Sequence, residues 1–223
     1  MNTGCWLAQD SVQAWLNEHG LGHSEEDLIK MWAFFEEEAL KKLEEVSEES
    51  PKQVYVWTST LTLPWYVEYL APSRFAIEIW NSARNPDSWD SKTIKAVAEK
   101  GYKMVFSNEE QTYLDLGYLG WNYQRQLSTV YEDNPYKILE RHGVNNFEEA
   151  ESNVLGGEIA LWTEITDDST LVMMMEPRTA AYGEMLWRDP RHSSSWAEAS
   201  YRMLRHRERL QERGVQAETI TNG

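Results

Sequence analysis

Two short β-rich runs decide the fold of this chain: Gln53-Val54-Tyr55-Val56-Trp57-Thr58 and Phe75-Ala76-Ile77-Glu78-Ile79-Trp80. The second run is apolar with one interruption, at Glu78. Between the two, Thr62 to Tyr69 has room for a turn of helix. Further along, Lys103–Ser107 predicts a third strand, and the run Gly157–Trp162, which includes the second glycine of a Gly-Gly pair, predicts a fourth.

Helical segments separate these strands. Ser24-Glu25-Glu26-Asp27 resembles a capping box, and an apolar stripe follows at three- and four-residue spacing: Leu28, Met31, Trp32, Phe35, Ala39 and Leu43. A second helix is expected over Thr93–Lys100, where Gly101 ends it. Three more are expected from about Trp121 to Tyr131, from Thr170 to Trp187 with a break at Pro177, and from Trp196 to Glu212.

This alternation of strands and helices defines the fold class. Strands that alternate with helices form parallel sheets with crossover helices, so we expect an α/β chain. Four strands are half the number that an eight-stranded barrel needs. The 223 residues contain no Gly/Ser linker, so we expect one partial domain over residues 1–223.

Composition narrows the function classes. The net charge of −16 and a pI near 4.7 argue against nucleic acid and against docking on an anionic membrane, and they suit neutral or cationic ligands such as amino sugars. The chain has 11 Trp where average usage gives roughly three. Tryptophan at this density is typical either of a core or of a cleft that stacks on sugar rings, and the count alone leaves both open.

Several other classes lack their signature residues. Cys5 is the one cysteine, so neither an intrachain disulfide nor a cysteine metal cluster is expected, and the five scattered histidines have no metal-ligand spacing. No phosphate-binding or dinucleotide fingerprint occurs, and we expect no cofactor. No apolar run is long enough to span a membrane, and the start, Met1 to Asp10, lacks a signal peptide. A truncated start would hide such a signal, so localisation stays open.

Each predicted strand ends in, or leads into, an aromatic residue, and two of the four aromatics have a carboxylate two positions later. These residues are Trp57, Trp80, Tyr113 with Asp115, and Trp162 with Glu164. A single Trp is more often core filler, but four strand ends with the same chemistry are harder to explain by packing. Functional side chains of (β/α)8 barrels lie at the carboxyl ends of the strands. Indole rings stack on pyranose faces and carboxylates accept bonds from hydroxyls, so the pattern indicates a sugar pocket.

The motifs around these residues resemble a known family. Tyr113-Leu114-Asp115, the run Val154-Leu155-Gly156-Gly157-Glu158-Ile159-Ala160-Leu161-Trp162-Thr163-Glu164, and Pro177-Arg178 with Glu184-Met185-Leu186-Trp187 resemble the family 20 glycoside hydrolases, of the β-N-acetylhexosaminidase kind. Trp196 to Gln216 is similar to the insect-type, chitooligosaccharide-trimming branch. The resemblance implies the C-terminal half of a (β/α)8 barrel that acts on N-acetylglucosamine- or N-acetylgalactosamine-terminated glycans or chitooligosaccharides. The parent family is extracellular or lysosomal.

The resemblance also implies a role for each strand-end residue. Trp57, Trp80 and Trp162 would grip the terminal N-acetylhexosamine, while Asp115 and Glu164 would hold its hydroxyls. Tyr113 would donate its hydroxyl to the acetamido oxygen, which attacks the anomeric carbon in substrate-assisted hydrolysis. In the family an Asp orients the acetamide and the neighbouring Glu is general acid and then base.

That Asp-Glu pair is expected to be absent here. The family carries it in a segment like H-x-GGDEV, a few residues before Cys-Trp, and this chain has Met1 just ahead of Cys5-Trp6. The resemblance therefore implies a hydrolase that lost its N-terminal half, with the isolated chain inactive. A sugar-binding or interaction remnant without hydrolase activity, and an acidic scaffold without any ligand, are the alternatives.

Smaller features follow from the resemblance. The segment after Trp121 is shorter than the loop of the chitin-trimming branch, and the family's Trp-Pro-Arg appears as Glu176-Pro177-Arg178. Arg178 and Glu184 are expected to form or flank an ion pair. Half a barrel leaves open strand edges and an uncovered apolar face, so we expect self-association or poor solubility.

Overall fold

Four parallel strands form one sheet at the centre of the molecule. The computed structural model describes residues 2–48, 53–80, 89–115, 125–164, 166–188, 191 and 195–220. The strands are β1 (Val54–Trp57), β2 (Phe75–Ile79), β3 (Met104–Phe106) and β4 (Val154–Gly157), and their order in the sheet is their order in the chain. The predicted α/β class with parallel strands is therefore confirmed.

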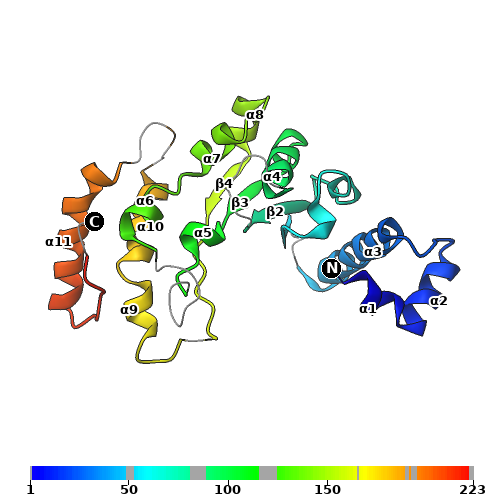
Figure 1. The fold of residues 1–223 in the computed structure, drawn as a ribbon, viewed down its shortest axis with the longest axis horizontal. Helices are drawn as coiled ribbons and strands as arrows, with labels where there is room; N and C mark the ends of the chain where they lie inside the picture. The colour runs from blue at the N-terminus through cyan, green and yellow to red at the C-terminus, as the bar shows by residue number, and fades with distance from the viewer. Residues whose placement is uncertain are drawn as a thin grey trace.

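Helices precede, separate and follow the strands (Figure 1). Before β1 lie α1 (Thr3–Leu7), α2 (Asp10–Glu18) and α3 (Glu25–Val46), and two 3-10 turns, η1 (Thr60–Thr62) and η2 (Val67–Tyr69), join β1 to β2. Helix α4 (Trp89–Glu99) precedes β3, and α5 (Glu109–Thr112), α6 (Leu127–Tyr131), α7 (Pro135–Arg141) and α8 (Phe147–Ser152) precede β4. The described chain ends with α9 (Leu171–Met175), α10 (Arg178–Trp187), α11 (Trp196–Glu212) and a short tail.

The two faces of the sheet differ sharply. The helix-covered face carries completely or almost completely buried apolar side chains: Phe75, Ile77, Ile79, Met104 and Phe106. They pack in one cluster with residues of α3, α4 and α7, such as Ile29, Val97 and Ile138. Because successive strand residues point to opposite faces, Tyr55, Trp57, Ala76, Glu78, Val105 and Leu155 form the other side, which we call the open face. Tyr55 is 51% exposed there and Leu155 48%.

Several local predictions are confirmed. Ser24 and Asp27 form a reciprocal capping box at the start of α3: the Asp27 amide donates to Ser24 Oγ at 3.2 Å, and the Ser24 amide donates to Asp27 Oδ2 at 3.0 Å. The break at Pro177 separates α9 from α10, and the last helix has the predicted bounds.

The fourth strand was predicted too late in the chain. It covers Val154–Gly157 and not Gly157–Trp162. Its partner β3 ends at Phe106, three residues before α5, and among the described residues the segment after β4 is bridged further at Ala160, to Tyr113. Trp162 therefore lies five residues beyond the strand.

Helix positions were corrected in three places. The helix predicted from about Trp121 begins at Leu127, although residues 121–124 lie outside the described part. Helix α4 starts at Trp89 and not at Thr93. The short helices α1, α2, α7 and α8 were not predicted, although Asn134-Pro135 is a helix-start signal: Asn134 Oδ1 accepts the amide of Tyr136 at 2.9 Å.

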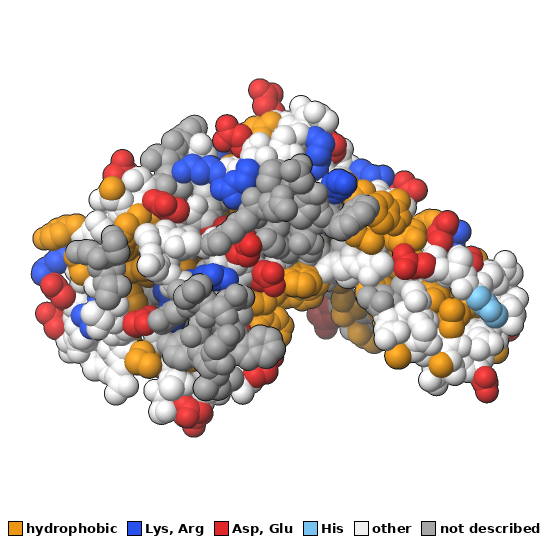
Figure 2. Space-filling view, viewed as in Figure 1, with side chains coloured by type: hydrophobic (Ala, Val, Ile, Leu, Met, Phe, Trp, Pro, Cys, Tyr) orange, Lys and Arg blue, Asp and Glu red, His pale blue; other side chains and the backbone are white. Residues whose placement is uncertain are grey.

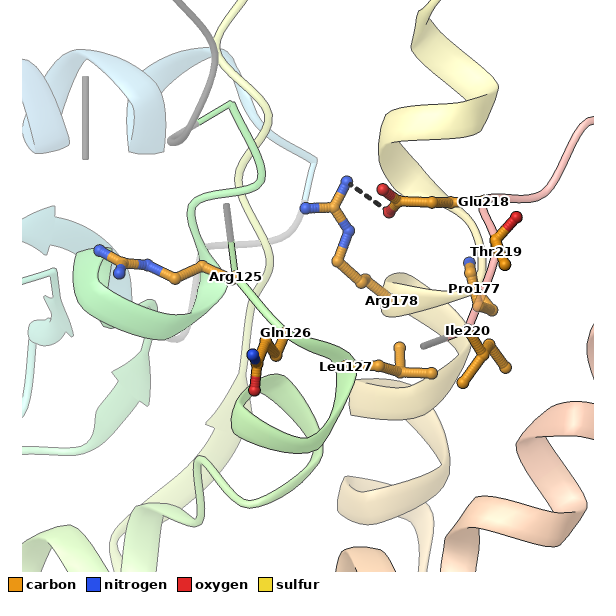
Figure 3. A pocket seen from close by; sticks show the side chains of 8 residues that line it. All are labelled: Arg125, Gln126, Leu127, Pro177, Arg178, Glu218, Thr219 and Ile220. Carbon is orange, nitrogen blue, oxygen red and sulfur yellow. Dashed lines mark ion pairs between the residues drawn. The ribbon is translucent and has the colours of Figure 1, made fainter. Parts of the chain in front are cut away.

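The C-terminal tail is tied to the junction of α9 and α10. Buried Arg178 faces the Glu218 carboxylate across a cavity of about 80 Å³, with Nη2 and Oε2 3.5 Å apart, while Arg125 points away from this pair (Figure 3). Arg178 and Glu184 do not pair with each other in these contacts, because Glu184 instead binds Arg202 at 2.6 Å. Each is therefore a member of an ion pair, but with a different partner: Arg178 with Glu218 and Glu184 with Arg202.

Candidate functional site

Three of the predicted residues meet beyond the carboxyl ends of β3 and β4. The parallel bridge between Tyr113 and Ala160 joins the two segments, and the Leu114 amide donates to the Ala160 carbonyl at 2.8 Å. Asp115 Oδ1 accepts the backbone amide of Trp162 at 3.3 Å. The rings of Tyr113 and Trp162 are 5.9 Å apart between centroids, tilted by 59°. Phenol, carboxylate and indole therefore form one cluster.

Two more predicted residues stand at the ends of β1 and β2. Trp57 is the last residue of β1, lies opposite Glu78 and is 37% exposed on the open face. Trp80 follows β2 and is half-buried. Buried Thr58 fixes it twice: its carbonyl accepts the indole Nε1–H at 2.6 Å, and its hydroxyl accepts the Trp80 amide at 3.3 Å. This orients the Trp80 ring.

The sixth predicted residue, Glu164, is exposed two positions after Trp162. Direct contacts bring together Tyr113, Asp115 and Trp162, while Trp57 and Trp80 stand separately on neighbouring strand ends. All five occupy the same end of a parallel sheet, which is the end where ligands bind in barrels.

The electrostatics of the site favour a neutral Tyr113. Burial raises the pKa of its phenol, and the charges of Glu109, Glu78 and Asp115 raise it further, against an opposing hydrogen bond with Trp162. The hydroxyl therefore keeps its proton through the neutral range. A protonated phenol can donate to a carbonyl oxygen, as the sequence resemblance implies for this position.

Two carboxyls of the site were not predicted. Glu78 lies on the open face but is only 8% exposed, and burial together with a hydrogen bond and charge repulsion from Glu158 raises its pKa to about 7. The signal was visible in the sequence, because Glu78 is the one polar residue of an otherwise apolar strand and Glu158 follows the Gly156-Gly157 pair. Within the described residues, no group of three or more His, Cys, Asp or Glu is placed to hold a metal ion.

Fold and site together define a class of protein: a parallel α/β chain of the barrel type, with a cluster of aromatic and carboxylate side chains beyond the carboxyl ends of its strands. The model of the glycosyl hydrolase family 20 catalytic domain matches residues 1–190. The chain belongs to glycoside hydrolase family 20.

Curated relatives agree over nearly the whole chain. The chitooligosaccharidolytic β-N-acetylglucosaminidase of Ostrinia furnacalis is 33% identical over 99% of this chain and 36% of its own length. The protein of the same name from Bombyx mori is 29% identical over 97% of this chain and 35% of its own length. The chain thus spans about a third of the length of these relatives.

Solved structures bear out the fold. A family 20 exo-β-N-acetylglucosaminidase from Vibrio harveyi, in complex with N-acetylglucosamine, has a TM-score of 0.70 and 20% identity, over 96% of this chain and 31% of that one. A chitobiase from Flavobacterium johnsoniae has a TM-score of 0.66 and 24% identity, over 94% and 28%. The four strands and their helices are therefore one part of a (β/α)8 barrel, as expected.

Charged side chains of both signs are mixed on the surface of the described residues (Figure 2). Acidic side chains are spread over the visible face with basic ones among them, and they do not gather in a single patch (Figure 2). None of the described helices combines the length and the apolar content that crossing a bilayer requires.

Proposed function

We propose that this chain carries the sugar-holding part of a β-N-acetylhexosaminidase. Its ligand is the terminal N-acetylglucosamine or N-acetylgalactosamine of a glycan or chitooligosaccharide. The observation that supports this most directly is the cluster of Tyr113, Asp115 and Trp162 at the strand ends of a family 20 chain. The relatives from Ostrinia furnacalis and Bombyx mori are chitooligosaccharidolytic, which supports chitooligosaccharides as one substrate class.

Each residue has a task in this proposal. The indoles of Trp57, Trp80 and Trp162 cover the apolar faces of the pyranose ring. The neutral Tyr113 phenol donates to the acetamido oxygen and holds it toward the anomeric carbon, which that oxygen attacks. Asp115 and Glu164 accept hydrogen bonds from ring hydroxyls.

Turnover needs two further carboxyls that the 223 residues do not supply. The sequence contains no Asp-Glu dipeptide, so the acetamide-orienting Asp and the general acid Glu of the family motif have no counterpart in it. We propose that the chain by itself binds the sugar without hydrolysing it. Hydrolysis would then require a polypeptide that brings this pair to the site.

Fluorescence titration with N-acetylglucosamine tests the binding proposal. We expect quenching of tryptophan emission in the unchanged chain, and about a tenfold loss of affinity in Trp162→Ala, which corresponds to the removal of one stacking contact. Trp187→Ala is the matched control, because that indole is 93% exposed on α10, and it should bind as the unchanged chain does. Equal affinity in Trp162→Ala would contradict the site.

Hydrolysis is measured separately with an aryl N-acetylglucosaminide. Release of the aryl group no faster than with boiled protein is the expected result. Activity above that level in the purified 223-residue chain would contradict the proposal that the general acid is missing, while leaving the binding result untouched.

A further inference from the structure

Trp162 carries the most exposed aromatic ring of the site. Because the ring is 46% exposed, packing in a core does not fix its direction. Its backbone is instead held from two sides: the amide donates to Asp115 Oδ1 at 3.3 Å, and the carbonyl accepts the Thr166 hydroxyl at 3.4 Å. Asp115 belongs to the site, whereas Thr166 lies just before α9. The direction of the indole therefore depends in part on what holds Thr166 and α9 in place.

Helix α9 connects Thr166 to a buried arginine. The Thr166 hydroxyl also contacts Met174 Sδ at 3.5 Å, and Met174 is 1% exposed in α9. The Met174 carbonyl accepts a hydrogen bond from Arg178 Nη2, and Arg178 is likewise 1% exposed at the start of α10. Helix α9 has 5 residues, and helices below about 12 residues are marginal in isolation. Its position is therefore set by such tertiary contacts.

The tail that follows α11 reaches the same arginine from the far end of the chain. Ile220 packs against the apolar cluster of α6, α10 and α11. The Glu218 amide donates to the Glu176 carbonyl at 2.9 Å, and the Glu218 carbonyl accepts Arg207 Nε of α11 at 2.6 Å. The Oε2 atom of Glu218 lies 3.5 Å from Arg178 Nη2 (Figure 3). The guanidinium nitrogen that binds α9 thus also binds the tail.

We propose that this tail, residues 215–220, is a strap that positions Trp162 for the sugar. The tail holds Arg178, Arg178 binds the carbonyl of Met174 in α9, and the sulfur of the same methionine contacts Thr166, whose hydroxyl binds the Trp162 carbonyl. A tail that served only α10 and α11 would need no contact with the group that binds α9. Arg178 and Thr166 are therefore positioning residues. The effect on sugar affinity rests on the proposed function, whereas the direction of the indole does not.

The first experiment observes the Trp162 ring without sugar. The 223-residue chain is labelled with fluorotryptophan, and the ¹⁹F resonance of Trp162 is assigned by its loss in Trp162→Phe. Glu218→Ala, which removes the contact with Arg178, should shift this resonance. Glu212→Ala is the matched control, because Glu212 is an exposed glutamate at the end of α11, and should leave it in place. An unmoved resonance in Glu218→Ala overturns the proposal. If that variant does not fold, Arg207→Gln, which releases the tail from α11, takes its place.

A second pair of variants tests the last contact before the indole. Thr166→Val replaces the hydroxyl by a methyl group of similar size, and Thr166→Ser keeps the hydroxyl. The Trp162 resonance should shift in the valine variant and return to its place in the serine variant, while the midpoint of urea denaturation stays the same in both. A merely structural role of Thr166 would change the midpoint and leave the resonance in place, and that result overturns the proposal.

Affinity for N-acetylglucosamine, measured by tryptophan fluorescence, tests the consequence for the ligand. We expect about threefold weaker binding in Glu218→Ala and in Thr166→Val, which is at the low end of couplings carried through packed side chains. Glu212→Ala and Thr166→Ser should bind as the unchanged chain does. A shifted resonance with unchanged affinity contradicts the role of the strap in sugar binding. No binding by the unchanged chain contradicts the proposed function, and the ¹⁹F resonance then still decides whether the tail directs the indole.

Discussion

The helix-covered face and the open face of the sheet are built from the same four strands but have opposite character. Along β2, Phe75, Ile77 and Ile79 are completely or almost completely buried under helices, and along β1, Tyr55 and Trp57 stay substantially exposed on the other side. The helix-covered face holds an apolar cluster, and the open face holds indoles and the buried Glu78. Side chains on one face thus stabilise the fold, while those on the other are available for chemistry.

Parallel sheets normally have both faces covered. In a complete (β/α)8 barrel the inner face closes on itself through the remaining strands, and the chain spans only about a third of its curated relatives. We therefore expect substitutions on the helix-covered face to change stability and those on the open face to change binding, titration or association.

The largest effect is expected from Phe75→Ala. Phe75 is fully buried in the apolar cluster, so its removal should lower the free energy of unfolding by about 3–5 kcal/mol. Tyr55→Ala is the matched control: Tyr55 pairs with Ala76, the residue after Phe75, and lies on the open face, 51% exposed. It should cost less than about 1 kcal/mol. Urea denaturation followed by circular dichroism measures both, and equal losses would erase the distinction between the faces.

The pH dependence of stability is the next largest effect. Burial and Glu158 raise the pKa of Glu78 to about 7 from an ordinary 4.5, so the folded chain holds this proton over a range in which the unfolded chain has lost it. Folded protein then binds more protons, and the free energy of unfolding falls as pH rises from about 4.5 to 7. The shift corresponds to at most roughly 3 kcal/mol.

Other carboxyls also contribute to the pH dependence of stability, so the contribution of Glu78 is measured as the difference between the unchanged chain and Glu78→Gln. The pKa values of Asp27, Glu99 and Asp167 are lowered by hydrogen bonds, and their contribution to stability is lost toward acid pH. Subtracting the urea-denaturation profile of Glu78→Gln from that of the unchanged chain removes these shared terms. A flat difference between pH 4.5 and 8 would show that Glu78 ionises normally.

Sequence patterns predicted the strands of the helix-covered face well and the open face incompletely. The buried side of α3 was predicted wrongly in part: Ile29, Ala33 and Leu40 are buried, whereas Phe35 and Leu43 of the expected stripe are 65% and 43% exposed. Apolar runs such as Phe75–Ile79 and the capping box at Ser24 report directly on local structure, which is why the strands β1 to β3 and helix α3 were placed correctly. The six site residues came from strand ends, and three of them meet in one cluster. Their exact contacts depend on the register between β3 and β4, which a sequence does not contain.

The errors share one physical cause. The strand predicted at Gly157–Trp162 was displaced because its partner β3 ends at Phe106, a long-range fact that local alternation does not reveal. Thr58 was missed for the same reason, since its two bonds to Trp80 cross between strands 22 residues apart. Glu78 was predicted only as an interruption of an apolar strand, because its raised pKa depends on burial and on Glu158, 80 positions later in the chain.

A smaller loss of stability is expected where β4 touches a helix. A Cβ added to Gly157 would lie 2.0 Å from the Tyr182 hydroxyl and 2.7 Å from the ring carbon that bears it. Tyr182 is buried on α10 and donates to the Phe106 carbonyl at 3.3 Å, so it cannot move away without breaking that bond. Gly157→Ala should therefore cost about 1–3 kcal/mol of unfolding free energy in urea.

The control for that clash is the neighbouring helical glycine. A Cβ at Gly183 meets no atom within 4 Å, and alanine is the better helix former, so Gly183→Ala should be neutral or stabilising by up to about 1 kcal/mol. If Gly157→Ala lowered the free energy of unfolding no more than Gly183→Ala does, the result would contradict close packing of β4 on α10.

The smallest effect on stability should come from Leu155→Ser, which instead tests whether the open face drives self-association. Leu155 is 48% exposed on β4, so the substitution should change the unfolding free energy by no more than about 0.5 kcal/mol.

An uncovered apolar face at an open strand edge favours association between copies. We expect the sedimentation coefficient of the unchanged chain to rise with concentration, and to rise less in Leu155→Ser. Val46→Ser is the control. It removes an apolar side chain that is 81% exposed but lies at the end of α3, away from the open face, so this variant should sediment as the unchanged chain does. A concentration-independent monomer in all three proteins would mean that the open face is not an association surface, and that its indoles serve the ligand alone.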